Sequence, residues 1–219
     1  MTKTNSKVVV VGASGFGREC LDVLEAIIEF DGSIEIIGVL DDSPSETNLA
    51  RLEVRSIQYL GTVDDYLQNA STEIQFVVAI GNPKIRESVV KKFASKNLRP
   101  YSAIHPSAII GSQVVIGDGV VICAGAILST NVFIDRYVHL NPGVIVGHDS
   151  RLDSFVSINP GAVISGEVNI ETGVLVGASS LVLQQLRVGS KSIIGAGAVV
   201  TRNVPHAVIV KGIPGRWEI

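Results

Sequence analysis

A six-residue period governs the second half of this chain. From Ile104 to Val200, every sixth residue is Ile, Leu or Val, which gives seventeen aliphatic positions in one register. The residue four places further on is nearly always small or β-branched, and the residue directly after the aliphatic one is often Gly, Asp or Asn. A register of this length does not arise by chance, so the segment must consist of stacked copies of one short unit. The aliphatic positions are Ile104, Ile110, Ile116, Ile122, Leu128, Ile134, Leu140, Val146, Leu152, Ile158, Ile164, Ile170, Val176, Val182, Val188, Ile194 and Val200.

Each hexad is long enough for one short flat strand and a turn, with its aliphatic residue pointing inward. Three hexads would close one triangular coil of 18 residues, and the seventeen hexads make nearly six coils. A single coil cannot bury its own apolar interior, so the coils must stack. The composition agrees, because hydrophobic residues make up 46% of the chain and aromatic residues only 5%. The period predicts a parallel β-helix over residues 101–219, with a C-terminal extension, but it does not fix the handedness of the coil.

Residues 1–100 follow a different pattern, in which short β-branched runs alternate with helical spacing. Strands are expected at 7–11, 34–40 and 74–80, and helices at 15–29, 62–69 and 83–96. Thr62 is a candidate N-cap for the second helix, and Pro83 suits the start of the third. This alternation predicts a small, Rossmann-like parallel α/β sheet. The chain is therefore expected to form two domains, 1–100 and 101–219.

A glycine-rich turn joins the first expected strand to the first expected helix. Gly12, Gly15 and Gly17 have the spacing G-x-x-G-x-G, which differs from the usual dinucleotide fingerprint G-x-G-x-x-G. Such a turn lets the backbone approach a ligand closely, and a helix N-terminus favours phosphate. A tight strand-to-helix turn without a ligand explains the same spacing, so this motif alone is weak.

Polar residues follow the other two expected strands of this sheet. Asp41 and Asp42 come after the second strand, and Gly81 and Asn82 come after the third, followed by Pro83 and Lys84. Ligands of open parallel sheets bind at the carboxyl ends of the strands, so these ends are expected to meet in one crevice. The sheet is too small for a whole dinucleotide, which favours a nucleotide-linked small molecule over NAD.

The hexad around His148 carries the clearest catalytic signal. His148 is followed directly by Asp149, and its place after the inward Val146 points its side chain outward. One coil further along the stack the matching residue is Gly166, and one coil back it is Thr130. A glycine beside the imidazole leaves room for a thioester and offers an open backbone N–H to an oxyanion. A carboxylate that orients the ring would strengthen His148 as a general base. A polar turn is the plainer alternative.

Several classes of partner are disfavoured by the bulk properties. The formal net charge is −3, so no basic footprint for nucleic acid is expected. No apolar run has the length of a membrane span, and the first residues do not resemble a signal peptide. The two cysteines, Cys20 and Cys123, lie far apart and are expected to be buried in a reducing compartment. We therefore expect a soluble cytoplasmic protein without a metal site.

The chain resembles the nucleotide-sugar acetyltransferases of the left-handed β-helix superfamily, of the bacillosamine-pathway and sialic acid acetyltransferase type. The resemblance covers nearly the whole chain and is carried by the hexads and by GASGFG, LDD, AIGNPKIR, GHDS, INPGAVISG and VVTRNVPHAVIVKGIPGR. It implies left-handed coiling, a homotrimer, and acetyl-CoA as the co-substrate in a groove between subunits. It also implies catalytic roles for His148 and Asp149, acetyl-CoA contacts at Ser157, Gly166, Ala178 and Ala196, and substrate contacts at Ser14, Gly15, Phe16, Asp41, Asp42, Gly81 and Lys84.

One position departs from the pattern of that family. Relatives often carry a second histidine nine residues after the base, where this chain has Ser157. A hydroxyl can still donate a hydrogen bond to CoA, but it lacks the imidazole ring. The base itself is unaffected by this difference.

The expected function is transfer of an acetyl group from acetyl-CoA to the amino group of a nucleotide-linked amino sugar, for surface glycan synthesis. The amine of the sugar would attack acetyl-CoA directly, with His148 as the general base and without a covalent acyl-enzyme. Two alternatives stay open: O-acetylation of sialic acid or another small acceptor, and a non-catalytic nucleotide-sugar-binding scaffold. A γ-type carbonic anhydrase is a weaker option because its histidine triad is missing. The sequence does not name the sugar or the nucleobase.

Overall fold

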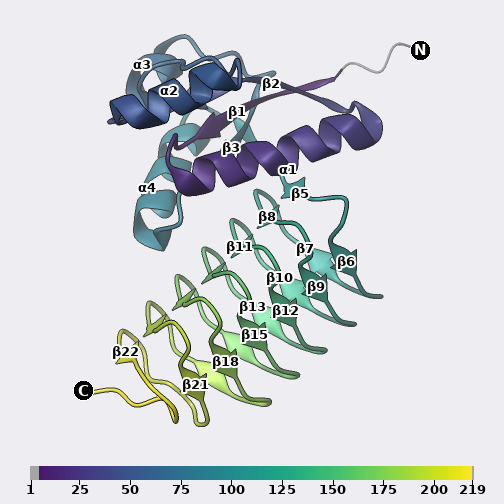
Figure 1. The fold of residues 1–219 in the computed structure, drawn as a ribbon, viewed down its shortest axis with the longest axis vertical. Coiled ribbons are helices and arrows are strands. Elements are labelled where there is room, and N and C mark those ends of the chain that lie inside the picture. The colour runs from purple at the N-terminus through teal and green to yellow at the C-terminus, as the bar shows by residue number, and fades with distance from the viewer. Residues whose placement is uncertain (1–4, 219) are drawn as a thin grey trace. The chain divides into compact units, whose positions relative to one another are not determined.

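The structure is a computed structural model that describes residues 5–218, and these fall into two compact units. The first unit contains the described residues up to Gly81 together with Ile85–Pro106. The second contains Asn82–Lys84 and the described residues from Ser107 onward. Figure 1 shows the first unit in purple, blue and teal, and the second as a series of parallel coils that run from teal through green to yellow.

The first unit is built on a four-stranded parallel sheet in the order β2-β1-β3-β4. Its strands are β1 (Ser6–Val11), β2 (Ile34–Leu40), β3 (Gln75–Val78) and β4 (Arg99–Pro100). The second of these has the bounds that the sequence predicts, whereas the third is shorter and the last was not predicted. The last strand contains a proline, which suits its place at the edge of the sheet.

Four helices accompany this sheet: α1 (Gly15–Asp31), α2 (Glu46–Val54), α3 (Val63–Gln68) and α4 (Pro83–Ala94). Thr62 caps α3 as predicted, since its side chain accepts a hydrogen bond from the Asp65 amide. The sequence reading missed α2, which buries only Leu52 and so gives almost no apolar periodicity. Ser45 was the available signal, because its side chain caps this helix by accepting from the Asn48 amide at 3.2 Å.

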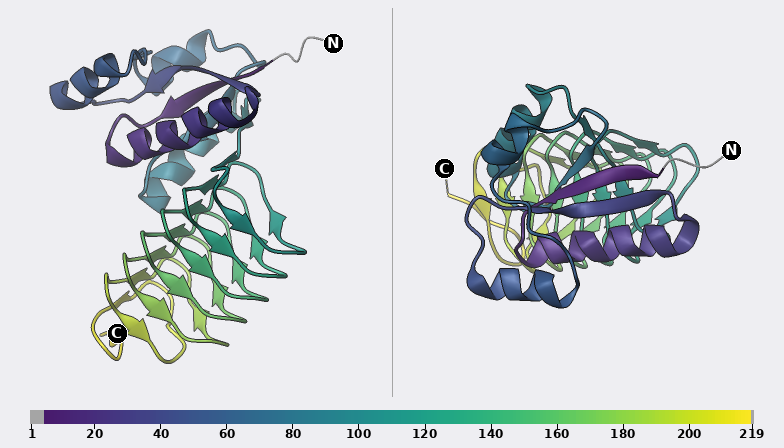
Figure 2. Two further views of the ribbon diagram at one scale, coloured as in Figure 1. Left: turned by 45° about the vertical axis from the view of Figure 1, so that its right-hand side comes forward. Right: turned by 90° about the horizontal axis from the view of Figure 1, so that it is seen from above.

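The second unit is a parallel β-helix of two-residue strands. Its coils repeat every 18 residues, as the pairing of Ile145 with Val163 and of Val163 with Leu181 shows. Figure 2 shows these coils edge-on and from above. The short strand β5 (Ala103–Ile104) still belongs to the first unit. The strands of the second unit are β6 (Ile109–Ile110), β7 (Val115–Ile116), β8 (Val121–Ile122), β9 (Ile127–Leu128), β10 (Phe133–Ile134), β11 (His139–Leu140), β12 (Ile145–Val146), β13 (Arg151–Leu152), β14 (Ser157–Ile158), β15 (Val163–Ile164), β16 (Asn169–Ile170), β17 (Leu175–Val176), β18 (Leu181–Val182), β19 (Arg187–Val188), β20 (Ile193–Ile194), β21 (Val199–Val200) and β22 (Ile209–Val210).

Three flat sheets form the sides of this prism. We call them the β6–β21 sheet (β6, β9, β12, β15, β18, β21), the β7–β19 sheet (β7, β10, β13, β16, β19) and the β8–β22 sheet (β8, β11, β14, β17, β20, β22). From Ile122 to Val200, each predicted inward residue is at most 1% exposed. Ile110 is 39% exposed, because its strand β6 lies at the edge of its sheet. The predicted hexad interior is thus confirmed from Ile122 onward, whereas Ile104 and Ile116 are only half-buried.

Turn residues with left-handed backbone stack from coil to coil at the corners. Asn131 has φ 57° and Asp149, 18 residues later, has φ 59°. Asn and Asp tolerate this conformation better than most residues, so their presence at these corners has a local backbone reason as well as a chemical one.

No helix in the described part of the chain is long and apolar enough to span a membrane.

Candidate active site

His148 lies on an exposed corner of the β-helix, between β12 and β13. Its Nδ1 is 2.7 Å from Oδ2 of Asp149, and the two side chains are 55% and 47% exposed. An ionised carboxylate can only accept, so Nδ1 carries the proton in this pair and Nε2 is left as the basic nitrogen. The ring therefore presents Nε2 for a proton transfer, while Asp149 fixes its tautomer and orientation.

Asp149 is held in turn by the neighbouring coil. Its Oδ1 accepts a hydrogen bond from Asn131 Nδ2 at 3.0 Å, and its amide donates to the Thr130 carbonyl at 3.1 Å. Hydrogen bonds from His148 and then from Asn131 lower the pKa of the Asp149 carboxyl below its ordinary value. Asn131 was missed by the sequence reading. Its signal was the 18-residue offset, which places it directly beside Asp149 in the stack.

Gly166 lies against the imidazole, as the coil period predicts. A Cβ added to Gly166 would lie 2.5 Å from His148 Nε2 and 2.6 Å from Cε1, so any side chain there would displace the ring. The His148 carbonyl accepts from the Glu167 amide at 2.8 Å, which fixes the separation of the two coils. Within residues 5–218, no acceptor pairs with the Gly166 amide. This N–H is available to a ligand beside Nε2.

The other three predicted acetyl-CoA positions do not gather around Gly166 in a single chain. Gly166 lies at the corner that joins the β6–β21 and β7–β19 sheets. Ala178 and Ala196 lie at the opposite edge of the β6–β21 sheet, where it meets the β8–β22 sheet. Ser157 is only 1% exposed and pairs with His139 between β14 and β11. The structure thus places these residues on different parts of the prism.

The backbone of the glycine-rich turn in the first unit passes close to the backbone of a neighbouring segment. Gly12 has φ 117°, and a Cβ there would lie 2.7 Å from the Ala79 carbonyl oxygen. Ser14 and Gly15 are exposed and Phe16 is half-buried at the start of α1. The Ser14 side chain makes no capping hydrogen bond to α1, so its hydroxyl is not committed to the helix end. The predicted turn is therefore a tight strand-to-helix loop whose outer residues, Ser14 and Gly15, are exposed.

Asp41 and Asp42 both have structural partners at the end of β2. The Asp41 carboxylate accepts from the Ala13 amide at 2.8 Å and from the Ser43 amide at 2.9 Å. The Asp42 carboxylate accepts from the Val63 amide at 2.8 Å, at the start of α3. The bond from Ala13 ties the glycine-rich turn to the end of β2, and the bond from Val63 ties that end to the start of α3. Each carboxylate keeps further acceptor capacity for a ligand.

Arg86 is a buried residue of this unit that the sequence reading did not single out. Its Nη1 donates to the Ile80 carbonyl at 2.8 Å and to the Gly81 carbonyl at 3.3 Å, and the side chain is fully buried. Burial lowers the pKa of Arg86 to about 9. The guanidinium shapes the loop that contains Gly81, next to the exposed Lys84. Its place in the stretch AIGNPKIR was the available signal.

Metal ligands do not cluster in the described part of the chain: residues 5–218 contain no group of three or more His, Cys, Asp or Glu side chains that could hold an ion. The chain thus combines two features. Its small parallel sheet has a glycine-rich turn between β1 and α1, and its β-helix has a histidine that is hydrogen-bonded to a carboxylate and lies beside the Gly166 amide, which is unpaired within the described residues. These features define the class of hexapeptide-repeat acyltransferases with an N-terminal nucleotide-binding-type domain.

Comparisons with known proteins specify the family further. Residues 7–93 match the family described as the PglD N-terminal domain. The acetyltransferase domain of PglB from Neisseria gonorrhoeae is 31% identical and superposes with a TM-score of 0.88, over 98% of this chain and 100% of that one. The chain belongs to this family of hexapeptide-repeat acetyltransferases, and the predicted two-part fold with a left-handed β-helix is confirmed.

The names of two further relatives include an amino sugar. GDP-perosamine N-acetyltransferase of Escherichia coli O157:H7 is 32% identical over 141 residues, which cover 64% of this chain and 61% of that protein. The matched part is thus about three fifths of that relative. A crystal structure of PerB from Caulobacter crescentus, with CoA and GDP-perosamine bound, is 26% identical, with a TM-score of 0.84 over 97% of each chain.

Proposed function

We propose that this protein transfers the acetyl group of acetyl-CoA to the amino group of a nucleotide-linked amino sugar. The observation that carries this proposal is the pair His148–Asp149, 2.7 Å apart, placed against the open amide of Gly166. The whole-length likeness to the PglB acetyltransferase domain supports the donor, because a second structure of that domain holds acetyl coenzyme A. The perosamine enzymes support a nucleotide amino sugar as the acceptor.

The chemistry follows from the two nitrogens of the His148 ring. The neutral amine of the sugar attacks the thioester carbonyl carbon, and Nε2 takes the proton that the nitrogen loses. The carbonyl oxygen gains negative charge, which the Gly166 amide stabilises. The tetrahedral intermediate then expels CoA as a thiolate, which recovers a proton from the imidazolium. Asp149 keeps the ring oriented and balances its transient positive charge, and Asn131 positions Asp149.

The first unit would bind the nucleotide part of the acceptor. Ser14, Gly15 and Phe16 would contact the phosphates at the N-terminus of α1, whose free amides and dipole favour anions. Asp41, Asp42, Gly81 and Lys84 would contact the rest of the ligand at the carboxyl ends of β2 and β3. The division of labour assigns nucleotide-sugar binding to residues 1–100 and acetyl transfer to residues 101–219.

A donor and acceptor screen tests the proposed function. Acetyl-CoA is incubated with 3-amino and 4-amino sugars linked to UDP, dTDP or GDP, and products are read by mass. We expect a gain of one acetyl group on an amino sugar, with equal release of CoA thiol. Acetylation only of a hydroxyl, or of free sialic acid, would contradict the amino acceptor. Nucleotide-sugar binding without thiol release from any acceptor would identify a scaffold instead.

We further infer that the protein works as a homotrimer through the outer face of the β6–β21 sheet. All outward residues of this sheet are aliphatic: Ile109, Ile127, Ile145, Val163, Leu181 and Val199. The outward residues of the β7–β19 sheet instead include Arg151, Asn169 and Arg187. The β8–β22 sheet has His139 and Ser157 among its outward residues, so only the β6–β21 sheet is aliphatic along its whole length. A continuous apolar stripe of this kind is typical of an interface that excludes water.

The split of the acetyl-CoA positions supports the same interface. If the aliphatic face turns toward a three-fold axis, one edge of it in each subunit meets the other edge in the next. Gly166 of one subunit would then face Ala178 and Ala196 of the partner subunit across a groove. A trimer would thus complete three equivalent sites that a single chain leaves divided.

An arginine placed on the aliphatic face should separate the subunits. Ile145→Arg puts a charge at the centre of this face and is expected to give a monomer by light scattering, with transfer activity reduced at least 10-fold. Ile193→Arg is the matched control, because Ile193 is an outward strand residue of the β8–β22 sheet with nearly equal exposure, 41% against 40%. The control should keep the oligomer. A wild-type protein that is monomeric, or an Ile145→Arg trimer, would refute the interface.

A cytoplasmic location completes the proposal. Cys20 and Cys123 are both buried and do not form a disulfide with each other, which fits a reducing compartment.

A further inference from the structure

One buried serine interrupts an aliphatic column at the corner that carries His148. The column consists of the fourth residue after the aliphatic position in each hexad of this corner, in steps of 18 residues. The sixth-residue pattern makes five of its members aliphatic, and these are Val114, Val132, Val168, Leu186 and Val204. The exception is Ser150, which is 1% exposed and belongs to the hexad of His148. A buried hydroxyl costs free energy unless it is hydrogen-bonded, so its partners indicate why it is there.

The Ser150 hydroxyl bridges the two ends of the turn 165–168 in the neighbouring coil. Its Oγ donates a hydrogen bond to the Ser165 carbonyl at 2.9 Å and accepts one from the Val168 amide at 3.2 Å. A direct bond between the first carbonyl and the last amide of such a turn would close it, as at 159–162, where it measures 3.2 Å. Within residues 5–218 the turn 165–168 lacks that direct bond, so the hydroxyl takes its place.

The turns at the corner of His148 are open, in contrast to those at another corner of the prism. The direct bond is lacking, among the described residues, in turns 129–132, 147–150, 165–168 and 183–186. Where the β8–β22 sheet meets the β6–β21 sheet, the bond closes turns 141–144, 159–162, 177–180 and 195–198 at 3.1–3.3 Å. A turn without this bond restrains its peptide groups less. Of the four open turns, a hydroxyl bridges the one that contains Gly166.

The bridged carbonyl belongs to the same peptide group as the Gly166 N–H. A trans peptide is planar and its N–H points away from its C=O, so a hydroxyl that holds the Ser165 oxygen also fixes the direction of the Gly166 N–H. A hydrogen bond to the carbonyl polarises the peptide and makes its N–H a stronger donor. The same peptide lies close to Gly147, where an added Cβ would be 2.6 Å from the Gly166 nitrogen. The peptide is thus held by Ser150 and Gly147 together.

We propose that Ser150 is a positioning residue for acetyl transfer, whose hydroxyl orients and polarises the Gly166 amide toward the developing oxyanion. This inference rests on the proposed function, in which that amide stabilises the negative charge on the thioester oxygen. Ser150 acts through the peptide of Gly166 and, being buried, does not touch either substrate. Its sequence signal is the single hydroxyl in an aliphatic column, within the hexad that also supplies the base.

Another buried serine makes the same pair of bonds at a different corner, away from His148. The Ser192 Oγ donates to the Pro205 carbonyl at 2.7 Å and accepts from the Val208 amide at 3.3 Å. Ser192 is fully buried, like Ser150. Removing its hydroxyl therefore measures what such a bridge contributes to stability alone, which makes Ser192→Val the matched control.

Two variants of nearly equal shape separate the hydroxyl from the packing. Ser150→Val and Ser150→Thr both introduce a β-branched side chain, which the column already carries in neighbouring coils, and they differ in the hydroxyl. Ser150→Val is expected to lower kcat about 10-fold, which is less than the roughly 10²–10³-fold cost of removing an oxyanion donor. KM for both substrates and the shape of the pH profile should stay nearly unchanged, because neither the binding contacts nor the base is altered. Ser150→Thr should restore most of kcat.

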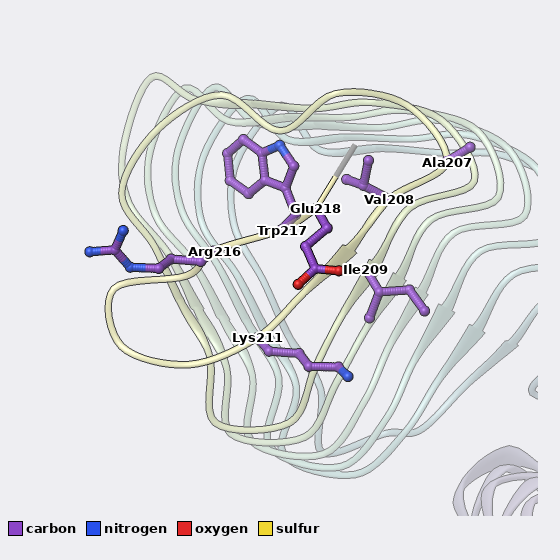
Figure 3. Close-up of a pocket in the computed structure, with 7 residues that line it drawn as sticks. All are labelled: Ala207, Val208, Ile209, Lys211, Arg216, Trp217 and Glu218. Atoms are coloured by element: carbon purple, nitrogen blue, oxygen red, sulfur yellow. The ribbon is translucent and has the colours of Figure 1, made fainter.

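Trp217, the single tryptophan of the chain, reports on the folding of these variants. The Arg202 guanidinium lies over its ring, 4.5 Å from the centroid. Figure 3 shows the indole with the Lys211 and Glu218 side chains around a cavity at the C-terminal end of the β-helix. Its emission should therefore change when the last coils unfold.

Stability and kinetics together distinguish positioning from a structural role. Ser150→Val and Ser192→Val should lower the melting temperature to a similar extent, because each loses the same pair of hydrogen bonds. Turnover should fall in Ser150→Val alone. An equal fall in kcat in both variants would show that the bonds act through stability and would overturn the positioning role.

The amide resonance of Gly166 gives a measurement that does not depend on activity. In protein labelled with ¹⁵N-glycine, the Gly166 peak is assigned by its absence from Gly166→Ala. Ser150→Val is expected to shift this peak, because the hydrogen bond to the preceding carbonyl is lost, and Ser150→Thr should return it toward its original position. Ser192→Val should leave it in place.

The outcomes separate this inference from the proposed function. An unshifted Gly166 peak or an unchanged kcat in Ser150→Val would overturn the positioning role and leave acetyl transfer intact. Absence of transfer by the wild-type protein would instead refute the function, and the Gly166 peak would still decide whether Ser150 orients that amide.

Discussion

Replacing His148 with alanine is expected to lower kcat for acetyl transfer by about 10²–10⁴-fold, the usual contribution of a general base. The side chain is 55% exposed, so its removal should leave the fold and the melting temperature nearly unchanged. CoA binding, measured by calorimetry, should stay close to that of the wild-type protein, because the variant removes proton transfer and no donor contact. His206→Ala, at an exposed histidine elsewhere on the β-helix, serves as the control. Turnover that survives in His148→Ala would refute the mechanism.

Asp149→Asn gives a graded version of the same test. Asparagine tolerates the left-handed backbone at φ 59°, so the turn is kept while the negative charge is lost. The fall in kcat should be smaller than in His148→Ala, and acetyl-CoA should bind as before. The lowered pKa of Asp149 means that the wild-type carboxylate stays ionised through mildly acidic pH. The stability that the ionised Asp149 carboxylate contributes is fully present above the ordinary pKa range of a carboxyl group. It is lost only as the pH falls through the lowered pKa of Asp149.

Gly166→Ala is expected to lower kcat by at least 10-fold, although it adds a single methyl group. The new Cβ would fall within 2.6 Å of two ring atoms of His148, so the imidazole must rotate away from the amide beside which it acts. The ring is at the exposed end of a side chain and can move, so only a small loss of thermal stability is expected. Activity and melting temperature measured together distinguish displacement of the ring from unfolding.

A double-mutant cycle identifies the cause of that loss. In a His148→Ala background the ring is absent, so Gly166→Ala has no imidazole to displace and should add little further loss of turnover. Any stability penalty of the methyl group should also shrink there, because the space is empty. Independent, multiplicative losses in the double variant would show that Gly166 acts other than through His148 and would contradict the proposed geometry.

The candidate active-site corner was largely predictable because a strict 18-residue coil converts sequence separation into spatial contact. That rule placed Gly166 beside His148, and it also contained the contact between Asn131 and Asp149, which the reading overlooked. It could not reveal that Ser157 is buried beside His139. Burial of an outward strand residue depends on what covers it from outside, and no local pattern encodes this.

Fewer features of the first unit could be predicted from the sequence. The strand at 34–40 and the Thr62 cap were confirmed, since β-branched runs and capping residues act locally. Helix α2 was not predicted, because a mostly exposed helix of nine residues needs little apolar periodicity. The hydrogen bonds of Asp41 and Asp42 to the backbone were also invisible, because they join segments that only the folded sheet brings together.

The sequence by itself determined the coil, its period, its buried aliphatic column and the neighbours of His148, because each follows from a repeat that fixes contacts between residues 18 apart. The tertiary structure alone decided which edges of the prism carry which residues. It separated Ala178 and Ala196 from Gly166 across an aliphatic face, and it folded Trp217 onto Arg202. Both arise where the regular period ends or turns a corner, and there the chain's path depends on packing that no spacing rule contains.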